Sequence, residues 1–342
     1  MKNLTKPAQM VDADGSTLFS IQASQPRTQS EIMQDWGGAH EPIVSIVCAT
    51  YNHVNYIEDA ILGFLAQETT FAFEIIIRDD ASTDGTTEIV QYYAKKYPSI
   101  IRAVIEDENQ FSKGIRSIHI WPSLIKGEFT AFCEGDDFWV TSDKLQKQVE
   151  LLRKYQDAVM SVASTSKYED VGDGSFQYVK NVGENDRILQ GFEEVKTFYY
   201  HTSTYVIRSN VLIETIMKYA DDNYVFSDTS LRFILIVNGP FVMLSEVVSV
   251  HRITFRGVWT SLDRFKQWRW QVAIAESLLQ ILTGKYSRYQ GVCLFSLYYE
   301  DFRRCISSGD VMEGIKLIPK IIRYGVLYKL PSKILTCFST KS

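Results

Sequence analysis

Four short apolar runs recur along the first half of the chain at nearly constant intervals. They cover residues 43–49, 73–77, 100–105 and 129–133. The polar residues that follow them, Thr50, Asp79, Glu106 and Glu134, are 29, 27 and 28 positions apart, about the length of one strand, one helix and two short loops. The segments between the runs are predicted to be helices, over residues 56–67, 84–96 and 117–126. Four such units predict an α/β fold with a doubly wound, mostly parallel sheet flanked by helices, and a ligand at the carboxyl ends of the strands.

The fourth run is followed by three carboxylates within four residues, Glu134, Asp136 and Asp137. Carboxylates this close repel one another unless a cation or a strong hydrogen-bond donor lies among them. We therefore expect a hard metal ion and a phosphate at this strand end. The acids are expected to be exposed at the rim of the sheet and to contribute little to stability.

Composition limits the possible classes of protein. With 342 residues, of which 45% are hydrophobic and 23% charged, the chain has the make-up of an ordinary globular protein with a sizeable core. The net charge of −5 argues against a nucleic-acid partner. By pattern, residues 1–40 are an N-terminal extension, 41–260 the main α/β domain and 261–342 a C-terminal helical region.

Cysteine and apolar patterns bear on the compartment. The five cysteines include no CxxC pair, so neither a disulfide framework nor a zinc site is indicated, and a reducing, cytoplasmic compartment is expected. The apolar stretch at residues 233–245 numbers 13, whereas a membrane span needs about 20. No signal peptide is predicted, because the N-terminal residues lack a continuous apolar core.

The second half of the chain alternates between predicted strands and helices. Strands are predicted over residues 158–164, 205–208 and 241–250, and helices over 143–155, 209–219, 231–237 and from 262 onward. Residues 170–186 are expected to form a loop or a weak hairpin. The polar motif His201-Thr202-Ser203-Thr204 precedes one of the strands, and Asp228 precedes one of the helices.

Three motifs in register resemble those of one enzyme family. Residues 44–52, which end in Thr50-Tyr51-Asn52, look like the family's opening strand and T-Y-N turn. Residues 79–86 are similar to its D-D-x-S-x-D-G-T segment, and residues 134–137 to its D-x-D-D metal motif. The chain thus resembles the family 2 glycosyltransferases, inverting enzymes with the nucleotide-sugar-binding GT-A fold, from residue 43 to about 140 and more weakly to about 260.

The resemblance implies a role for each matching residue. The nucleotide-sugar pocket would be lined by Thr50, Tyr51, Asn52 and Asp80, with Asp80 accepting a hydrogen bond from the base. Asp136 and Asp137 would hold the ribose and a divalent cation, Mg²⁺ or Mn²⁺, on the diphosphate. Asp228 would be the catalytic base.

Two departures from the family pattern concern the metal. Glu134 stands where the family usually has Asp. Thr254 stands where many relatives carry a histidine after a Tyr-Arg pair, and His251-Arg252 stands for that pair. The resemblance therefore leaves a third protein ligand to the metal open.

Further residues are candidates on their chemistry, each with a competing interpretation. Asn109 and Lys113 follow the third strand and either bind the sugar or are ordinary loop residues. Arg252, with His251 and Arg256, either binds the diphosphate or is surface charge.

Helix starts offer competing explanations for two of the acids. Asp228 is either the base or an N-cap, with Asp221 and Asp222 as alternative bases. Thr83 or Asp84 is the expected N-cap of helix 84–96. The aromatic residues Trp139 and Trp259 are expected to pack rather than to stack on a sugar.

These inferences give one leading hypothesis and two rivals. The leading one is an inverting, metal-dependent glycosyltransferase that moves a sugar from a nucleoside-diphosphate donor to a glycan or lipid-linked glycan, in surface polysaccharide synthesis of O-antigen or capsule type. A sugar-nucleotide pyrophosphorylase would share the sheet, but it would carry a Gly-rich, Arg-containing loop where this chain has Thr50-Tyr51-Asn52-His53. A non-catalytic nucleotide-sugar-binding module is the second rival.

The C-terminal segment is both apolar and basic. Between residues 311 and 342 the cations Lys316, Lys320, Arg323, Lys329, Lys333 and Lys341 face one acid, Glu313. A helix of this kind either docks peripherally on the inner face of the plasma membrane or packs its apolar stripe on the preceding helices with its lysines in solvent.

Overall fold

The computed structural model describes residues 9–11, 17–20, 26–169, 176–177, 186–189, 200–219, 227–253 and 262–327. Two compact units make up the chain: Met1–Lys218 with Leu235–Gly257, and Tyr219–Ile234 with Val258–Ser342. Some residues discussed above lie outside the described residues: Asp221, Asp222, Thr254, Arg256, Trp259, Lys329, Lys333, Lys341 and most of 170–186.

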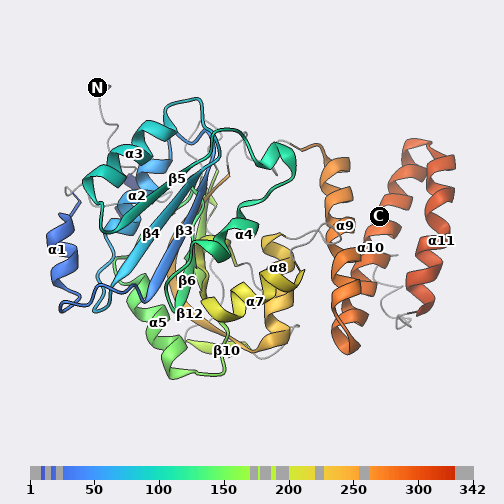
Figure 1. Cartoon of the computed structure of the whole chain (residues 1–342). Coiled ribbons are helices and arrows are strands. Elements are labelled where there is room, and N and C mark those ends of the chain that lie inside the picture. The colour runs from blue at the N-terminus through green and yellow to red at the C-terminus, as the bar shows by residue number, and fades with distance from the viewer. Residues whose placement is uncertain are drawn as a thin grey trace. The chain divides into compact units, whose positions relative to one another are not determined.

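One mixed sheet forms the centre of the first unit (Figure 1). Its strands lie in the order β10-β12-β8-β11-β6-β3-β4-β5. Their bounds are β3 (Val44–Thr50), β4 (Phe73–Asp79), β5 (Ile101–Ile105), β6 (Phe129–Phe132), β8 (Met160–Glu169), β10 (Arg187–Leu189), β11 (Val206–Arg208) and β12 (Phe241–Ile253). Off this path, β7 (Phe138–Trp139) pairs with β12 and β9 (Phe176–Gln177) pairs with β8.

The four strands predicted from the regular intervals form the parallel part of the sheet. In the order β6, β3, β4 and β5, each is parallel to its neighbour. The chain passes from β3 to β4 and β5 on one side and returns to β6 on the other, so the strand order reverses between β3 and β6. Ligands of open α/β sheets bind at such a reversal, outside the carboxyl ends of the strands. The predicted doubly wound sheet is confirmed, and it puts Thr50 and the acidic cluster at that edge.

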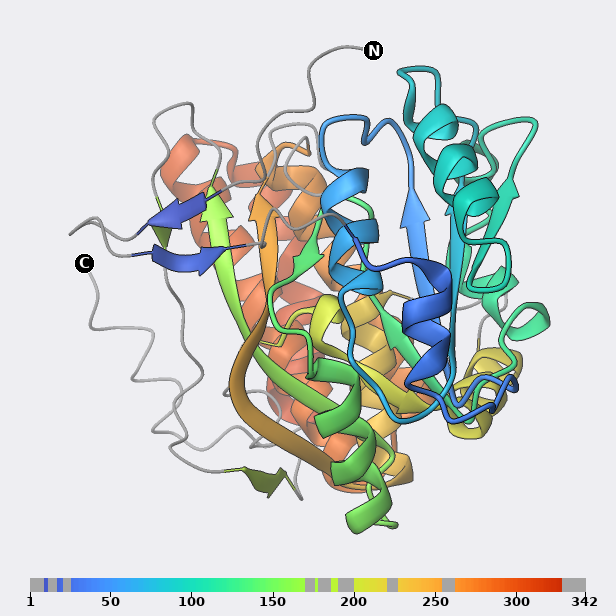
Figure 2. The same ribbon diagram turned by 90° about the vertical axis from the view of Figure 1, so that its left-hand side faces the viewer.

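Four helices cover one face of this sheet, the face turned toward the viewer in Figure 2. They are α1 (Gln29–Gln34), α2 (Ile57–Leu65), α3 (Thr86–Lys96) and α5 (Lys144–Lys154). In α2, Ile57, Ile61 and Phe64 recur at helical spacing and are fully buried against the sheet. The Phe64 ring packs edge-on against Trp139, with centroids 4.8 Å apart. Trp139 is therefore a packing residue, as expected.

The N-terminal extension contributes to this core. β1 (Gln9–Val11) and β2 (Thr17–Ser20) form a two-stranded antiparallel sheet. A capping box begins α1, because Thr28 and Glu31 exchange hydrogen bonds between side chain and backbone. Ile32 and Trp36 are buried in the core of the first unit, so α1 anchors the extension to it.

The helix predicted over residues 117–126 is shorter in the structure. α4 (Ser117–Ile120) gives way to the 3₁₀ turn η2 (Trp121–Ser123). Pro122 explains the change, because it has no N–H to continue an α-helical ladder. The two other 3₁₀ turns in the described residues are η1 (Phe111–Lys113) and η3 (Thr202–Thr204).

The later strands add an antiparallel element that the intervals did not reveal. β11 lies antiparallel between β6 and β8, and β12 runs parallel to β8. Helix α7 (Ser209–Tyr219) follows β11, as predicted, and α8 (Asp228–Asn238) precedes β12.

The predicted C-terminal helical region is confirmed. Its helices are α9 (Arg264–Ile281), α10 (Gly284–Ser308) and α11 (Val311–Leu327). α10 packs against both α9 and α11 around Val272, Leu294 and Tyr298. Within the described ranges, no helix is long and apolar enough to cross a membrane.

Lys144, the first residue of α5, is an unusual member of the core. It is fully buried, and its Nζ lies 4.2 Å from the centroid of the Trp139 ring. This Nζ has no hydrogen-bond partner in the described part of the chain. Burial lowers the pKa of Lys144 to about 7, because the ammonium form loses its hydration.

Lys144→Met is expected to stabilise the protein below about pH 7 and to lose this advantage as the pH rises toward 10.5. Between these values the unfolded lysine binds more protons than the folded one, so wild-type stability rises with pH, by up to about 1.4 kcal/mol per unit. Met has a similar volume and no charge to bury. Denaturant unfolding of both proteins at pH 6 and 9 measures the difference between their free energies of unfolding. If this difference is the same at both pH values, Lys144 does not titrate in this range.

Candidate functional site

The carboxyl end of β3 forms a tight turn beside the acidic cluster. Thr50 is the last residue of β3 and is 3% exposed. A Cβ atom on Gly135 would lie 2.6 Å from Thr50 Oγ1, so only glycine fits here. Tyr51 next to it is 44% exposed. The turn therefore presents an exposed aromatic ring at the edge where the strand order reverses.

Asn52 joins this turn to the loop after β4. It adopts a left-handed conformation with φ of +54°, which Asn tolerates better than most residues. Its backbone N–H donates to Ser82 Oγ at 2.8 Å, and its side-chain oxygen accepts from Thr83 N at 2.9 Å. Asn52 thus holds two strand-end loops together.

Asp80 holds a third loop. Its carboxylate accepts hydrogen bonds from Arg78 Nη2 at 3.0 Å, Gln110 N at 2.9 Å and Phe111 N at 3.0 Å. Asp80 is 5% exposed. The nucleobase of a donor would have to donate to the lone pairs of the Asp80 carboxylate that these three donors leave free.

The neighbouring acids hold the start of α3. Asp79 accepts hydrogen bonds from Ser82 and Thr87. The N-cap of α3 is Gly85 at φ +107°, so the prediction of Thr83 or Asp84 as N-cap is wrong. Asp84 instead accepts from Thr86 N and from Val54 N, which ties the helix start to the β3 turn.

Asn109 and Lys113 lie on the loop that Asp80 positions. Asn109 donates to Asp80 O at 3.3 Å and accepts from Ser112 N at 2.7 Å. Lys113 pairs with Glu108, and both side chains are at least half exposed. The loop therefore carries one amide held by hydrogen bonds and one exposed ammonium that is paired with Glu108.

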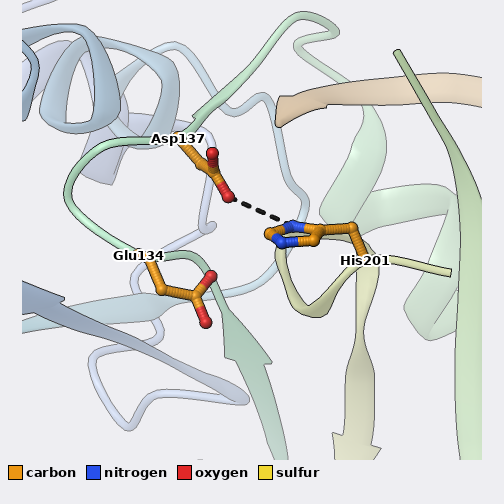
Figure 3. Close-up of side chains that lie close together, drawn as sticks. All are labelled: Glu134, Asp137 and His201. Atoms are coloured by element: carbon orange, nitrogen blue, oxygen red, sulfur yellow. Dashed lines mark ion pairs between the residues drawn. The ribbon is translucent and has the colours of Figure 1, made fainter. Parts of the chain in front are cut away.

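Glu134, Asp137 and His201 converge after the carboxyl end of β6 (Figure 3). Each offers one ligand atom, and these atoms lie within 4.8 Å of one another. His201 Nδ1 is 3.1 Å from Asp137 Oδ2. Thr202 Oγ1 donates to both Glu134 oxygens, at 2.8 and 2.9 Å, and so orients that carboxylate. Two carboxylates and one imidazole are a donor set that fits a divalent cation such as Mn²⁺.

Antiparallel pairing brings His201 to this cluster. Val206 of β11 lies opposite Ala131 of β6, so residues just before β11 face residues just after β6. The polar motif that contains His201 is visible in the sequence, but nothing within the motif indicates a role beside the acids. The signal available was a run of polar residues leading into a buried strand.

The acids of this cluster are costly to ionise. Burial raises the pKa of Asp137, and repulsion from Asp136 raises it further. Burial also raises the pKa of Glu134, against the opposing effect of His201. The expectation that these acids are exposed is wrong for Asp137, which is 1% exposed because β7 and β12 pair beside it.

Arg252 and His251 of β12 close the site from one side. Arg252 is 6% exposed; its backbone N donates to Asp137 Oδ1 at 2.8 Å and its Nη1 to Asp136 O at 3.0 Å. The guanidinium also pairs with Asp59 of α2. The His251 ring stacks on His201, with centroids 3.8 Å apart. Burial and the neighbouring His201 lower the pKa of His251 to about 4, so the imidazole stays neutral near pH 7.

Asp136 faces a different partner from Asp137. Its Oδ2 is 3.9 Å from His53 Nε2, and its side chain is 22% exposed. His53 Nδ1 and Thr50 Oγ1 are both buried without hydrogen-bond partners in the described residues. A Cβ atom on Gly135 would come within 3.0 Å of both orphaned atoms, so the glycine keeps the space beside them open.

Asp228 is the first residue of α8, and its side chain is outside the described part of the structure. Hydrogen bonds between Ser227 and Ser230 cap this helix: Ser230 N donates to Ser227 Oγ at 3.2 Å, and Ser227 N to Ser230 Oγ at 2.6 Å. The N-cap role that competed with the base role for Asp228 is therefore filled by Ser227.

Comparison with known proteins agrees with this architecture. The glycosyl transferase family 2 model matches residues 45–215. Rv1520 of Mycobacterium tuberculosis, an uncharacterised protein, is 30% identical over 252 residues, which cover 72% of this chain and 70% of that protein. TuaG of Bacillus subtilis, named as a teichuronic acid biosynthesis glycosyltransferase, is 37% identical over 120 residues, 35% of this chain and 44% of that protein.

A solved structure shares the fold. Residues 1–349 of TarS from S. aureus, in complex with UDP-GlcNAc, align with a TM-score of 0.56 and 17% identity over 83% of this chain and 80% of that one. The predicted GT-A-like architecture is thus confirmed at the level of the fold. With the family model, the fold and a relative matched over most of its length in agreement, the chain belongs to glycosyl transferase family 2.

Proposed function

We propose that this glycosyltransferase is an inverting, metal-dependent enzyme that moves a sugar from a nucleoside diphosphate to a hydroxyl of a glycan or lipid-linked glycan in surface polysaccharide synthesis. The convergence of Glu134, Asp137 and His201 at the strand reversal carries this proposal. The bound UDP-GlcNAc of TarS and the teichuronic acid role in the name of TuaG support the donor and product classes.

The cation would be held by Glu134, Asp137 and His201, with Asp136 facing the donor. Once bound, it would offset the negative charge that develops on the diphosphate as the sugar leaves. Thr202 and Arg252 keep Glu134 and Asp137 in place. A cation among these acids would also remove the penalty that burial and repulsion impose on their charged forms.

The donor would occupy the edge formed by the turn after β3 and the loops after β4 and β5. The orphaned Thr50 Oγ1 and His53 Nδ1 are polar atoms available to the nucleotide or diphosphate. Tyr51, Asn52, Asp80, Asn109 and Lys113 lie in these same turns and loops. Arg252 would act mainly by fixing Asp136 and Asp137, since protein groups already engage its guanidinium.

Transfer requires the acceptor hydroxyl to lose its proton as it attacks the anomeric carbon. A carboxylate within hydrogen-bond reach of that hydroxyl takes the proton, and we assign this role to Asp228. The acceptor oxygen forms a bond to the anomeric carbon while the bond to the diphosphate breaks on the opposite side. A single displacement of this kind inverts the anomeric centre.

Thermal-shift measurements with UDP, GDP and TDP, each with Mn²⁺, Mg²⁺ or excess chelator, test the proposal. We expect one nucleotide to raise the melting temperature, and only with a cation. Mn²⁺ is expected to act more strongly than Mg²⁺, because Mg²⁺ takes oxygen ligands and the proposed ligands include the imidazole of His201. Full stabilisation in chelator would contradict the metal site. Binding with neither hydrolysis nor transfer of the matching donor would favour a non-catalytic module.

A further inference from the structure

Helix α11 carries apolar side chains on two separate faces. One face is covered: Leu317 and Ile321 pack against the cluster formed by α9 and α10, and the Tyr324 ring stacks on Tyr298 with centroids 5.9 Å apart. Tyr324 is only 6% exposed. This face confirms that part of the apolar stripe packs on the preceding helices.

The second face is open to solvent. Its members, which we call the α11 stripe, are Val311 (48% exposed), Ile315 (48%), Ile318 (38%) and Ile322 (58%). Steps of four, three and four residues place these side chains along one line of a helix. Single exposed aliphatic residues are common, but a continuous row of them indicates a binding surface.

The helix that carries this stripe is also basic. Lys316, Lys320 and Arg323 lie on α11, whereas Glu313 is the one acid of the helix. The Lys316 side chain is 65% exposed and pairs with Glu313. The Lys320 side chain is 52% exposed, donates to Tyr298 Oη at 2.8 Å and lies 3.9 Å from Glu276, so it faces α9 and α10. The sequence after α11 adds three lysines and no acid. The segment from residue 311 onward is therefore apolar along one line of α11 and carries a net positive charge.

This chemistry selects one kind of partner. An exposed apolar helix face on a segment of net positive charge matches the boundary between lipid head groups and acyl chains, where anionic phosphates attract the cations. A second copy of the chain is a poorer fit. It would bring two segments of net positive charge together, and a stable dimer takes about 20 to 30 residues from each side.

We propose that the α11 stripe, together with Lys316 and Arg323 of the same helix, docks the protein on an anionic lipid surface. The aliphatic side chains enter the interface, and the cations bind the lipid phosphates. The docking surface does not depend on the proposed sugar transfer, because α11 carries none of the proposed site residues.

Co-sedimentation of the full chain with lipid vesicles tests this proposal. Vesicles of phosphatidylcholine alone are compared with vesicles that also contain phosphatidylglycerol, each at low and high salt. We expect sedimentation only with the anionic vesicles, and weaker sedimentation at high salt. Equal binding to both vesicle types would overturn the proposed charge recognition.

Two variants separate the apolar and charged contributions. Ile315→Ser/Ile318→Ser/Ile322→Ser is expected to abolish sedimentation. Its matched control replaces exposed apolar residues of other helices, Tyr92→Ser/Met217→Ser/Val237→Ser. Lys316→Gln/Arg323→Gln is expected to weaken binding on the order of 20-fold, about fivefold per cation.

The matched control for charge is Lys95→Gln/Lys154→Gln, on α3 and α5, which is expected to bind like wild type. The two charge variants should melt at the wild-type temperature, because the replaced side chains are exposed. The stripe variant must keep the wild-type helix content by circular dichroism, because Ile315 and Ile318 are half-buried. Unchanged sedimentation of the stripe variant would overturn the proposal. A dimer in solution that the stripe variant breaks, without any vesicle binding, would assign the surface to a second copy instead.

Discussion

Asp137→Asn is expected to abolish sugar transfer while the protein stays folded. Asn keeps the oxygen that accepts from Arg252 N, but it loses the charge of a proposed cation ligand. Metal stabilisation of a leaving diphosphate is worth several kcal/mol, so a loss on the order of 10³-fold or more is expected. Stability should not fall, since the variant no longer has to ionise a buried carboxyl.

Steady-state transfer and metal-dependent nucleotide binding measure this effect. Asp143→Asn is the matched control, because Asp143 is 44% exposed and pairs with Lys147 away from the cluster. It should retain wild-type activity. Full activity of Asp137→Asn, or of the wild type in excess chelator, would contradict a metal role for this carboxylate.

Measurements of Mn²⁺ affinity distinguish between two possible sets of metal ligands. The resemblance implies Asp136 and Asp137, whereas the geometry groups Glu134, Asp137 and His201. His201→Gln should weaken Mn²⁺ binding more than Asp136→Asn does. The opposite order would show that Asp136 is a metal ligand and that His201 only positions Asp137.

The parallel half of the fold could be predicted because its information is local. Each of the strands β3, β4, β5 and β6 lies 27 to 29 residues from the next, with a helix or turns between, and each ends in polar residues. Right-handed crossovers then bring all the carboxyl ends to one edge. The sequence alone therefore suffices to place Thr50, Asp80 and Asp137 together at that edge.

The antiparallel half could not be predicted in the same way, because its contacts join distant segments. His201 reaches Asp137 only because β11 pairs with β6. The register of that pair cannot be predicted from the sequence of either strand alone. The burial of Asp137 depends likewise on β12, which comes more than 100 residues later and supplies Arg252 N.

Asp80 shows a different limit of the sequence pattern. A carboxylate at a strand end is equally suited to a ligand and to the backbone N–H groups of the next loop. In the structure Gln110 and Phe111 supply such N–H groups. The motif identified the residue, but only the fold shows that it also holds the loop that carries Asn109.

Asp228→Asn is expected to lower kcat by at least about 10²-fold, the usual contribution of a general base, with donor affinity nearly unchanged. The reasoning is that attack by a hydroxyl needs one carboxylate apart from the metal cluster, and that Ser227 already caps α8. Asp263→Asn is the matched control: Asp263 caps α9 through Lys266 N, and Asn caps equally well, so activity should be retained.

Transfer kinetics and nucleotide titration distinguish the outcomes. If donor binding collapses in Asp228→Asn, the residue belongs to the nucleotide pocket, and Asp221→Asn and Asp222→Asn become the variants in which to look for the missing base.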